Sequence, residues 1–469
     1  MTYAEAIRYL YALEHGGVKL GLERIRAAVE ARGHPERRYA CVHVAGTNGK
    51  GSTCALLAAI LAASGYRTGL FTSPHLLDFR ERIRVAGALV SREDIAASTA
   101  RLRPLIDDLG LSFFEATTLL AFEIFAARRV QIALIEVGMG GRLDATNVIR
   151  PALTVVTGID LDHVQSLGRT RVHIAGEKAG IIKPGVPLLL GPCTPGVRRV
   201  FLEAAARAGA PLVRREERSF AEEVVPLKAG ARYRRRSRGG GARGSGRERP
   251  ADDGRRSVRL RGRHQVENAL LAEEAAVLLA ERGWEIPWRA RREGLAHGRW
   301  PGRFQIVRRP QRGPAIFDVA HNPQGGGTLA AGWRDWFPAE GAPGLIVGML
   351  GDKDHLAFFR KLRSLTDRLD LVALDSPRAC PIEGVAAAAR RAGFRPRVAA
   401  GMADAWASAG RGGRPVLVTG SFLTVEAGMR FLRMRPVRTL FPRSWGIGRT
   451  GSRSPARTKR GVRGVRRKP

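Results

Sequence analysis

Short apolar runs alternate along the chain with longer amphipathic segments of helical period. The runs predict strands, and apolar residues spaced three or four positions apart predict helices. In the first half, strands are expected at 68–71, 132–137, 153–159 and 186–190, and helices include 115–127 and 265–282. Strands that alternate with helices indicate an α/β fold with a mostly parallel sheet.

A second α/β unit is predicted after the Pro- and Gly-rich hexapeptide GRWPGR at 298–303, which has the composition of a domain boundary. Its strands are expected at 315–319, 344–349, 369–374 and 415–419, with helices near 325–336 and 355–365. No internal repeat relates the two units. The expected domains are therefore 1–297 and 298–429, followed by a tail at 430–469.

The most informative chemistry lies at 46–53, where the sequence GTNGKGST follows an apolar run and precedes an Ala- and Leu-rich helix. Glycines allow backbone N–H groups to close around phosphate oxygens, and Lys50 adds a mobile positive charge. The glycine that usually begins such a loop is replaced by Val44 or Ala45, so the loop is a shortened variant. A Gly-rich turn without a ligand is the alternative interpretation.

Polar residues at the ends of two further predicted strands extend this site. Glu136 ends the run 132–137, where an open α/β sheet places its ligands, and a carboxylate there suits magnesium. Asp162 and His163 follow the run 153–159 and offer a second oxygen or imidazole ligand. Lys178 lies in an apolar context, although an exposed helix face would also explain it.

Length and composition suggest two domains, since 469 residues with 44% hydrophobic content can build sizeable cores. The 4 cysteines lack metal-ligand spacing, which argues against a zinc site and a disulfide framework. No apolar run is long enough to span a membrane, and the amino terminus does not have the pattern of a leader. A soluble cytoplasmic protein is expected.

Two basic stretches, 228–263 and 430–469, hold more than two thirds of the net charge of +36. They contain few residues that could build a core, so both are expected to be disordered. The basic stretches could have three origins: a solvated loop or tail, a nucleic-acid-binding arm, or a shifted reading frame in a GC-rich gene. The remaining body is only moderately basic, and nucleic acid is not the expected partner.

Ordered motifs along nearly the whole chain outside these stretches resemble folylpolyglutamate synthases, and more closely the bifunctional dihydrofolate synthase/folylpolyglutamate synthases of the Mur ligase group. Besides GTNGKGST they are TSPHL (72–76), EVGMGGRLDATN (136–147), LDH (161–163), EKAGI (177–181), HQVENA (264–269), PGRF (301–304), DVAHNP (318–323), GDKD (351–354) and GSF (420–422). The relatives carry ordinary strands where the first basic stretch stands, and they usually end soon after the GSF motif.

The resemblance implies a P-loop mononucleotide-binding domain with a mostly parallel sheet at 1–297, which binds ATP and folate. A smaller Rossmann-like glutamate ligase domain is implied at 298–429. The implied reaction joins L-glutamate to dihydropteroate or to reduced folates through an acyl phosphate, with ATP as co-substrate. A monomer is expected from the family.

Site residues follow from the resemblance motif by motif. Catalytic roles are implied for Lys50, Lys178 and His163. ATP contacts are implied for Asn48, Gly49, Lys50, Gly51, Ser52, Asn268, Arg303, Asp318 and His321. Magnesium would be bound by Ser73, Glu136 and His163, and Lys178 matches a lysine whose carbamylated form binds a second magnesium ion in many relatives.

Three segments of this chain resemble those that line the pteridine pocket of the bifunctional relatives. They contain Leu20, Gly21, Ser112, Phe113, Phe114, Glu115, Leu143, Asp144 and Ala145. Lys19 stands where some bifunctional relatives have an acid, which weakens the expectation of dihydropteroate as a substrate. Two alternatives stay open at this point. One is a sister ligase that acts on a cell-wall precursor or another acidic peptide, and the other is a nucleic-acid-binding P-loop ATPase that uses the basic stretches.

Overall fold

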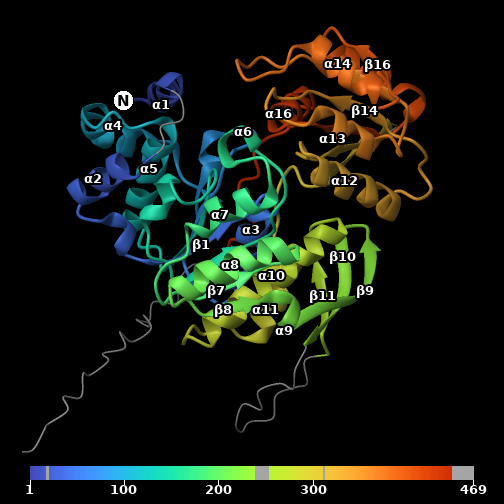
Figure 1. Ribbon diagram of the computed structural model, residues 1–469. Helices are drawn as coiled ribbons and strands as arrows, with labels where there is room; N and C mark the ends of the chain where they lie inside the picture. Colours follow the sequence, from blue (N-terminus) through green and yellow to red (C-terminus); the bar gives the residue numbers. More distant parts are fainter. Residues whose placement is uncertain (17–20, 238–252, 310–311, 446–469) are drawn as a thin grey trace, which may run out of the picture.

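Apolar strands of the first domain form one eight-stranded sheet in the order β4-β3-β2-β5-β1-β6-β7-β8. The computed structural model (Figure 1) describes residues 1–16, 21–237, 253–309 and 312–445. The strands are β1 (Ala40–Ala45), β2 (Thr68–Phe71), β3 (Ile83–Val85), β4 (Ala88–Leu89), β5 (Ile132–Glu136), β6 (Leu153–Val156), β7 (Leu188–Leu190) and β8 (Leu212–Arg214). Pairing is parallel from β2 to β8, and only β3 and β4 add antiparallel edges.

Helices cover both faces of this sheet, as the buried apolar strands require. Alternate residues of one strand point to opposite faces, so Val42 and Val44 of β1 enter one core and Cys41 enters the other. The first core is completed by α3 (Lys50–Ala63), α10 (Arg263–Ala280) and α11 (Trp288–His297). The second lies under α1 (Tyr3–Ala12), α2 (Glu23–Ala31), α4 (Arg92–Asp108) and α5 (Phe113–Ala127). Near β7, α7 (Arg171–Ala179) and α8 (Pro195–Arg207) enclose a third cluster, and α6 (Val164–Leu167) precedes them.

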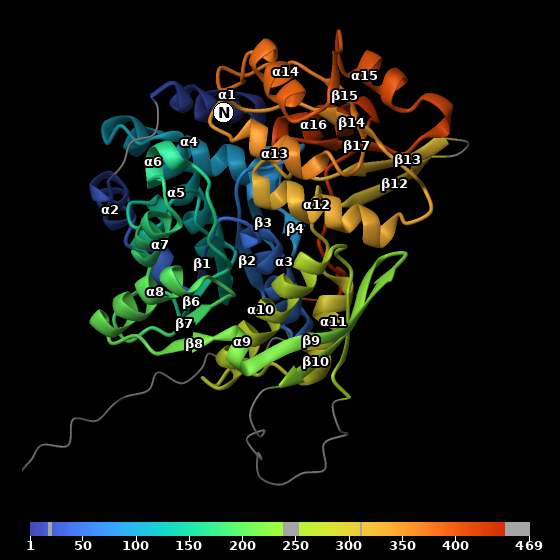
Figure 2. The same cartoon turned by 45° about the vertical axis from the view of Figure 1, so that its right-hand side comes forward.

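The second domain repeats this layering on a smaller scale (Figure 2). Its six-stranded sheet has the order β12-β13-β17-β14-β15-β16, parallel except for the β12–β13 pair. The strands are β12 (Gln305–Arg309), β13 (Arg312–Phe317), β14 (Gly344–Val347), β15 (Arg368–Leu371), β16 (Arg395–Val398) and β17 (Val416–Thr419). One face is covered by α12 (Pro323–Trp336), α13 (His355–Leu362) and α14 (Ile382–Arg391), and the other by α15 (Met402–Ala409) and α16 (Phe422–Phe431).

The predicted fold class is confirmed: a larger, mostly parallel sheet domain precedes a smaller α/β domain. Every strand expected from an apolar run is present, with ends that differ by a few residues. The short antiparallel strands β3, β4 and β12 were not predicted: β4 and β12 are edge strands with no buried position to mark them, and β3, between β4 and β2, has only three residues. Across the described ranges, no helix is long and apolar enough to cross a lipid bilayer.

The expectation of disorder is wrong for much of the first basic stretch. Residues Gly230–Ser237 (β10) and Arg255–Val258 (β11) pair with β9 (Ser219–Leu227) in an antiparallel sheet, next to the short helix α9 (Arg215–Arg218). Ala231, Tyr233 and Val258 are buried in the first core. Residues 238–252 lie outside the described residues.

Acidic residues of α10 explain why so basic a segment folds. The guanidinium of Arg256 contacts Glu273 at 2.7 Å, and that of Arg235 contacts Glu274 at 3.0 Å. Both carboxylates are fully buried, so each arginine neutralises a charge that would otherwise be very costly to bury. The acids stand 17 and 39 positions along the chain from the arginines they pair with, outside the basic stretch, so composition within the stretch did not reveal them.

The expectation of a disordered tail is also wrong for 430–445. After α16 the chain returns to the first domain, where the Leu89 amide donates to the Arg438 carbonyl (3.1 Å) and the Leu440 amide donates to the Gly87 carbonyl (3.0 Å). Leu440 and Phe441 are buried in the first core. We call residues 432–445 the C-terminal strap; residues 446–469 lie outside the described residues.

The strap should contribute substantially to stability. Replacing Phe441, which is 2% exposed, by Ala should lower the free energy of unfolding by about 3 kcal/mol, because the ring leaves a cavity beside Gly87. Leu202→Ala on α8, where the side chain is 46% exposed, is the control and should change it by less than about 0.5 kcal/mol. Guanidinium denaturation followed by circular dichroism measures both, and equal stability of the two variants would contradict the role of the strap.

Candidate active site

The loop between β1 and α3 has the shape expected of a phosphate-binding turn. Gly46 and Gly49 have φ angles of +147° and +86°, in the region that favours glycine. A Cβ on Gly46 would lie 1.9 Å from the Thr157 hydroxyl, and one on Gly49 would lie 2.4 Å from the Asn268 side-chain oxygen. Thr157 also donates to the Asn48 carbonyl at 2.6 Å, which fixes the loop against β6.

Helix α3 begins at Lys50, directly after this loop. The first N–H groups of a helix have no intrahelical acceptor and point toward an anion placed at the N-terminus. Lys50 Nζ contacts the Thr47 carbonyl (3.3 Å) and lies 4.0 Å from a Glu136 oxygen. The loop, the helix end and the lysine therefore converge on one point.

Glu136 ends β5 beside Lys50, and its other oxygen accepts the Ser73 amide at 3.2 Å. The carboxyl group is 4% exposed, and burial raises its pKa, an effect that the Lys50 charge opposes. A buried carboxylate next to a phosphate loop and a serine is a donor set that fits magnesium, whose other ligands are commonly phosphate oxygens and water. A cluster of three or more His, Cys, Asp or Glu side chains with metal-binding geometry is not found in the part of the chain that the structure describes.

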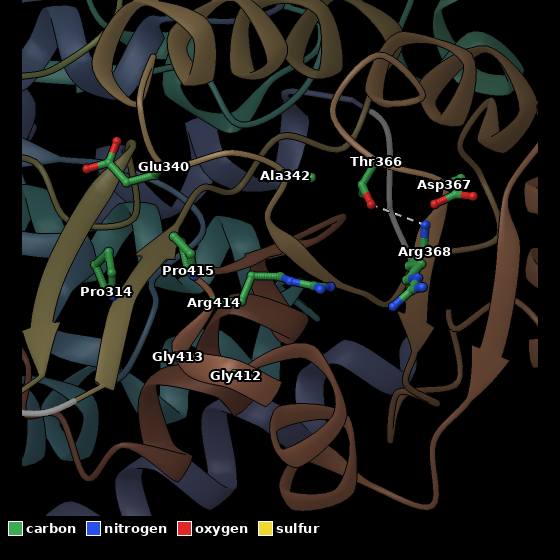
Figure 3. Close-up of a pocket in the computed structure, with 10 residues that line it drawn as sticks. All are labelled: Pro314, Glu340, Ala342, Thr366, Asp367, Arg368, Gly412, Gly413, Arg414 and Pro415. Carbon is green, nitrogen blue, oxygen red and sulfur yellow. Dashed lines mark hydrogen bonds between the residues drawn. The ribbon is translucent and has the colours of Figure 1, made fainter.

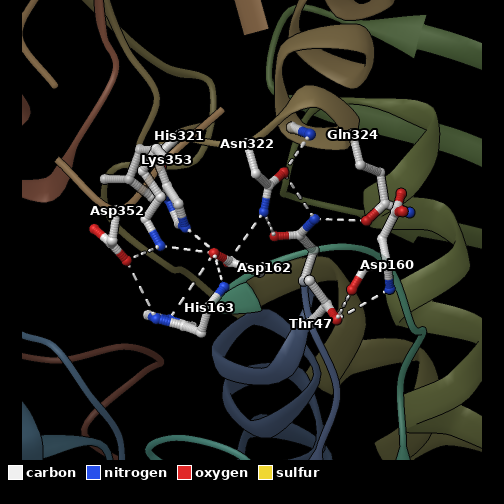
Figure 4. A network of polar contacts seen from close by, with 12 residues as sticks. Thr47, Asp160, Asp162, His163, His321, Asn322, Gln324, Asp352 and Lys353 are labelled. Atoms are coloured by element: carbon white, nitrogen blue, oxygen red, sulfur yellow. Dashed lines mark hydrogen bonds and ion pairs between the residues drawn. The ribbon is translucent and has the colours of Figure 1, made fainter. Parts of the chain in front are cut away.

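Asp162 stands at the centre of a polar network between the two domains (Figure 4). It contacts Lys353 Nζ at 2.6 Å, and His321 Nε2 and Asn322 Nδ2 at 3.3 Å each. Burial alone would raise the pKa of Asp162, but the hydrogen bond to His321 and the charges of His321 and Lys353 hold it well below its usual range. The network joins the C-terminal end of β6 to three positions on the second domain.

Two more contacts extend this interface. The side-chain amides of Asn48 and Asn322 exchange hydrogen bonds at 3.1 and 3.2 Å, so the phosphate loop itself contacts the second domain. His163 has a left-handed backbone, and its Nδ1 lies 3.4 Å from an Asp352 oxygen. The site is therefore assembled from both domains.

Arg303 and Asp318 lie where the chain enters the second domain. Asp318 accepts the backbone amides of Phe304 (2.8 Å) and Ala320 (2.9 Å); burial raises its pKa, which the Arg303 charge opposes. The Arg303 guanidinium lies 5.5 Å from the centre of the Phe422 ring. A small cavity of about 20 Å³ is shared by Arg303, Glu136 and ten other residues, namely Gly51, Thr72, Ser73, Pro74, Leu76, Glu81, Arg84, Trp300, Pro301 and Phe422.

Comparison with known proteins agrees with this geometry. The model of the Mur ligase middle domain matches residues 44–276, and that of the Mur ligase glutamate ligase domain matches 302–422. The dihydrofolate synthase/folylpolyglutamate synthase of Bacillus subtilis is 36% identical over 388 residues, which cover 81% of this chain and 86% of the relative. The chain belongs to the folylpolyglutamate synthase family of Mur ligases.

Solved structures of family members share the fold. Mycobacterium tuberculosis folylpolyglutamate synthase complexed with ADP and AMPPCP superposes with a TM-score of 0.82 at 31% identity, over 92% of this chain and 99% of that one. Escherichia coli FolC in complex with DHPP and ADP gives a TM-score of 0.78 at 32% identity, over 92% and 98%. This protein is accordingly an acid–amino-acid ligase of the Mur family.

Lys178 of this ligase is a buried amine on α7. It is 4% exposed, and its Nζ lies 3.5 Å from the Gly140 carbonyl. Burial and then the nearby Lys50 charge lower the pKa of Lys178 to about 7. Much of the amine is therefore neutral near pH 7, the state in which it can act as a nucleophile.

The residues that resemble the family's pteridine pocket fall into two adjacent groups. Ser112 and Glu115 form the N-terminal capping box of α5, and Phe113 stacks on Tyr11 with ring centres 5.6 Å apart. Phe114 packs against Gly138, which leads into the second group.

In that second group, Asp144 is buried and accepts the Met139 amide at 2.9 Å, whereas Leu143 is 41% exposed and Ala145 is buried. Gly21 has a φ of +127°, and Leu20 lies outside the described residues. The structure brings the two groups side by side through Phe114 and Gly138, and a role in pteroate binding stays a prediction.

Sequence reasoning missed several polar residues at the site. Asp352, Lys353 and Asn322 were noted only as parts of motifs, although their positions after β14 and β13 could have marked them. His75 was likewise given no role. It accepts from Arg82 Nε at 2.9 Å and contacts the Tyr11 hydroxyl at 3.0 Å, and burial followed by the Arg82 charge lowers its pKa to about 3.

A larger cavity of about 560 Å³ opens elsewhere, in the second domain (Figure 3). It is lined by Pro314, Glu340, Ala342, Thr366, Asp367, Arg368, Gly412, Gly413, Arg414 and Pro415. These residues lie at the amino ends of β13, β14, β15 and β17. Open α/β sheets bind ligands at the carboxyl ends of their strands, so size alone does not make this cavity the active site.

His43 of β1 provides a pH test of the core beneath the site. The Thr146 hydroxyl donates to Asp144, so it accepts from His43 Nε2–H at 2.8 Å, and burial lowers the pKa of His43 to about 3. Below about pH 6.5 the imidazole takes up a proton in the unfolded state but not in the folded state. The free energy of unfolding therefore decreases as the pH is lowered. Between pH 7.5 and 5.5 His43 should account for a loss of about 1.4 kcal/mol in unfolding free energy.

The variant His43→Gln keeps a donor for Thr146 but cannot titrate. Its unfolding free energy should therefore fall by about 1.4 kcal/mol less over this interval than that of the wild type. Urea denaturation at both pH values measures the difference. An identical pH dependence in the two proteins would show that His43 is not buried in its neutral form.

Proposed function

We propose that this ligase joins L-glutamate to dihydropteroate and to folyl-glutamates, with ATP converted to ADP and phosphate. The observation on which this rests is the meeting of the phosphate loop, the buried carboxylate of Glu136 and the cationic side chain of Arg303 at one site. Family members bound to ADP, and in one case to DHPP, support the same substrates.

The chemistry requires activation, because a carboxylate is a poor electrophile. An oxygen of the folate carboxylate attacks the γ-phosphorus of ATP, the bond to the β-phosphate oxygen breaks, and ADP leaves. The amino nitrogen of glutamate then attacks the acyl carbon, loses a proton and displaces phosphate, which leaves an amide. Lys50 and Arg303 stabilise the negative charge that spreads over the phosphoryl oxygens.

Magnesium is the proposed cofactor, with two ions at the site. Ser73, Glu136 and His163 would hold one ion, and a carbamylated Lys178 would provide an anionic ligand for the second. When bound, the ions neutralise phosphate charge and align the reacting oxygens. ATP contacts are proposed for Asn48, Gly49, Gly51, Ser52, Asn268, Asp318 and His321 in addition to Lys50 and Arg303. A cytoplasmic monomer is the proposed form of the protein.

Carbamylation of Lys178 is chemically favoured by its surroundings. The neutral amine attacks carbon dioxide, a nitrogen–carbon bond forms and a proton is released, which leaves a carboxylate on the side chain. The product places an anion close to the Lys50 cation, so the local charge becomes more balanced.

The proposed activity can be tested by product mass. The protein is incubated with ATP, magnesium and glutamate, and dihydropteroate and tetrahydrofolate are supplied separately. We expect each acceptor to gain one glutamyl unit. Gain on tetrahydrofolate alone would restrict the enzyme to chain extension, and gain on neither by protein that binds ATP would refute the proposal.

Lys50→Ala should slow ligation by about 100-fold or more, because a charge that stabilises the transition state is removed. Lys361→Ala, at an exposed position of α13, is the matched control and should keep wild-type activity. Rates of ADP release that depend on the folate acceptor measure both variants. Persistent ligation by Lys50→Ala would contradict the assignment of the phosphate loop.

Carbamylation can be tested separately with carbon-13 bicarbonate and NMR. We expect a carbamate resonance in the wild type that is absent from Lys178→Arg, whose guanidinium cannot be neutralised. Lys183→Arg is the control, since Lys183 donates to the Asn147 carbonyl (2.8 Å) outside the proposed metal site, and it should keep the signal. A resonance that survives in Lys178→Arg would place the carbamate elsewhere.

A further inference from the structure

We propose that Trp300 contacts the nucleotide, with its indole N–H donating to a phosphate oxygen of ATP. The inference deepens the proposed function and rests on it, since it needs a nucleotide at the phosphate loop. Trp300 belongs to the connection between the domains and is given no role by the motif assignments above.

The indole lies directly against the first turn of α3. A Cβ placed on Gly51 would be 2.9 Å from Trp300 Nε1, 3.0 Å from Cζ2 and 3.1 Å from Cε2. The edge of the ring that bears the N–H therefore faces the backbone of the phosphate-binding turn. Only a glycine at position 51 leaves room for this approach.

Trp300 also lines the small cavity that holds the reactive groups. Gly51, Ser73, Glu136, Arg303 and Trp300 all line it, and its volume of about 20 Å³ accommodates a group the size of one water molecule or one phosphate oxygen. Trp300 thus faces the space between the phosphate loop and the cation that the second domain supplies.

Two residues that line this cavity carry N–H donors that a phosphate could accept from. Among the residues with described positions, the Nε of Arg303 is buried without a hydrogen-bond partner, and the half-buried Trp300 lines the same cavity. A partly buried indole N–H usually finds a partner, and so does a buried guanidinium nitrogen. A phosphoryl group, which offers several anionic oxygens, would satisfy both donors at once.

Neighbouring backbone bonds hold Trp300 in place from both sides. The Arg299 amide donates to the Leu440 carbonyl of the C-terminal strap at 3.0 Å, and the Val319 amide donates to the Gly302 carbonyl at 3.0 Å. The ring itself packs against the first core. The indole is therefore positioned before ATP binds, which reduces the entropy lost when the contact forms.

The variant Trp300→Phe separates this role from packing, because it keeps an aromatic ring and removes only the N–H donor and part of the ring area. We expect its Kd for the non-hydrolysable analogue AMPPCP, or for both AMPPCP and ADP, to rise about tenfold, as for one lost hydrogen bond to a charged group. A change for AMPPCP alone places the contact at the γ-phosphate, and a change for both places it at the β-phosphate. The thermal midpoint should stay near that of the wild type.

Trp288→Phe is the matched control, since Trp288 is a partly exposed tryptophan of α11 that packs against Arg289 and Arg292. Its nucleotide affinity should be unchanged. Isothermal titration calorimetry measures both variants. Unchanged affinity in folded Trp300→Phe would overturn the proposal.

NMR of indole-¹⁵N-labelled protein gives a second readout that does not require the variant to fold. The chain has 7 tryptophans, so the Trp300 resonance can be assigned by elimination with Trp→Phe variants at the other positions. It should shift when AMPPCP is added, and a resonance that does not move at saturating AMPPCP would also overturn the proposal. These measurements need no folate acceptor. The proposed Trp300 contact can therefore be refuted while glutamate addition is confirmed, and glutamate addition can be refuted while the contact is confirmed.

Discussion

The arrangement of the active site depends on one buried anion, the carboxylate of Asp162. Burying it alone would be very unfavourable, and the domain interface compensates with Lys353, His321 and Asn322 at hydrogen-bond distance. All three partners belong to the second domain, whereas Asp162 follows a strand of the first. Because the charge is neutralised only when the domains meet, the same contacts that stabilise Asp162 bring both halves of the site together.

Such an interface suits a reaction in which phosphate charge must be stabilised and water excluded. The first domain supplies the phosphate loop and Glu136, and the connection to the second domain adds Arg303 and Trp300. The proposed acyl phosphate would hydrolyse readily in water, so a site completed by two domains would protect it until the amine attacks. The C-terminal strap adds a second link between the domains, since it starts at α16 and pairs with the edge strand β4.

The basic stretches show how composition can mislead when partners are distant. Residues 230–237 and 255–258 have too few apolar residues to build a core alone, yet Arg235 and Arg256 pair with buried acids of α10. Several of the arginines that suggested a nucleic-acid arm are therefore used inside the protein. The strap was missed for a similar reason, because its few apolar residues, Leu440 and Phe441 among them, are buried by a domain far away in sequence.

The sequence by itself determined the α/β class, the strands, the phosphate loop and the family motifs, because each depends on local periodicity or on residues close together in the chain. Lys50, Glu136 and Arg303 could be named for the same reason. The tertiary structure alone decided which groups meet: the pairing of Asp162 with Lys353, the burial that lowers the pKa of Lys178, and the approach of Trp300 to Gly51. Burial and long-range distances arise only when the domains pack, and no local pattern encodes them.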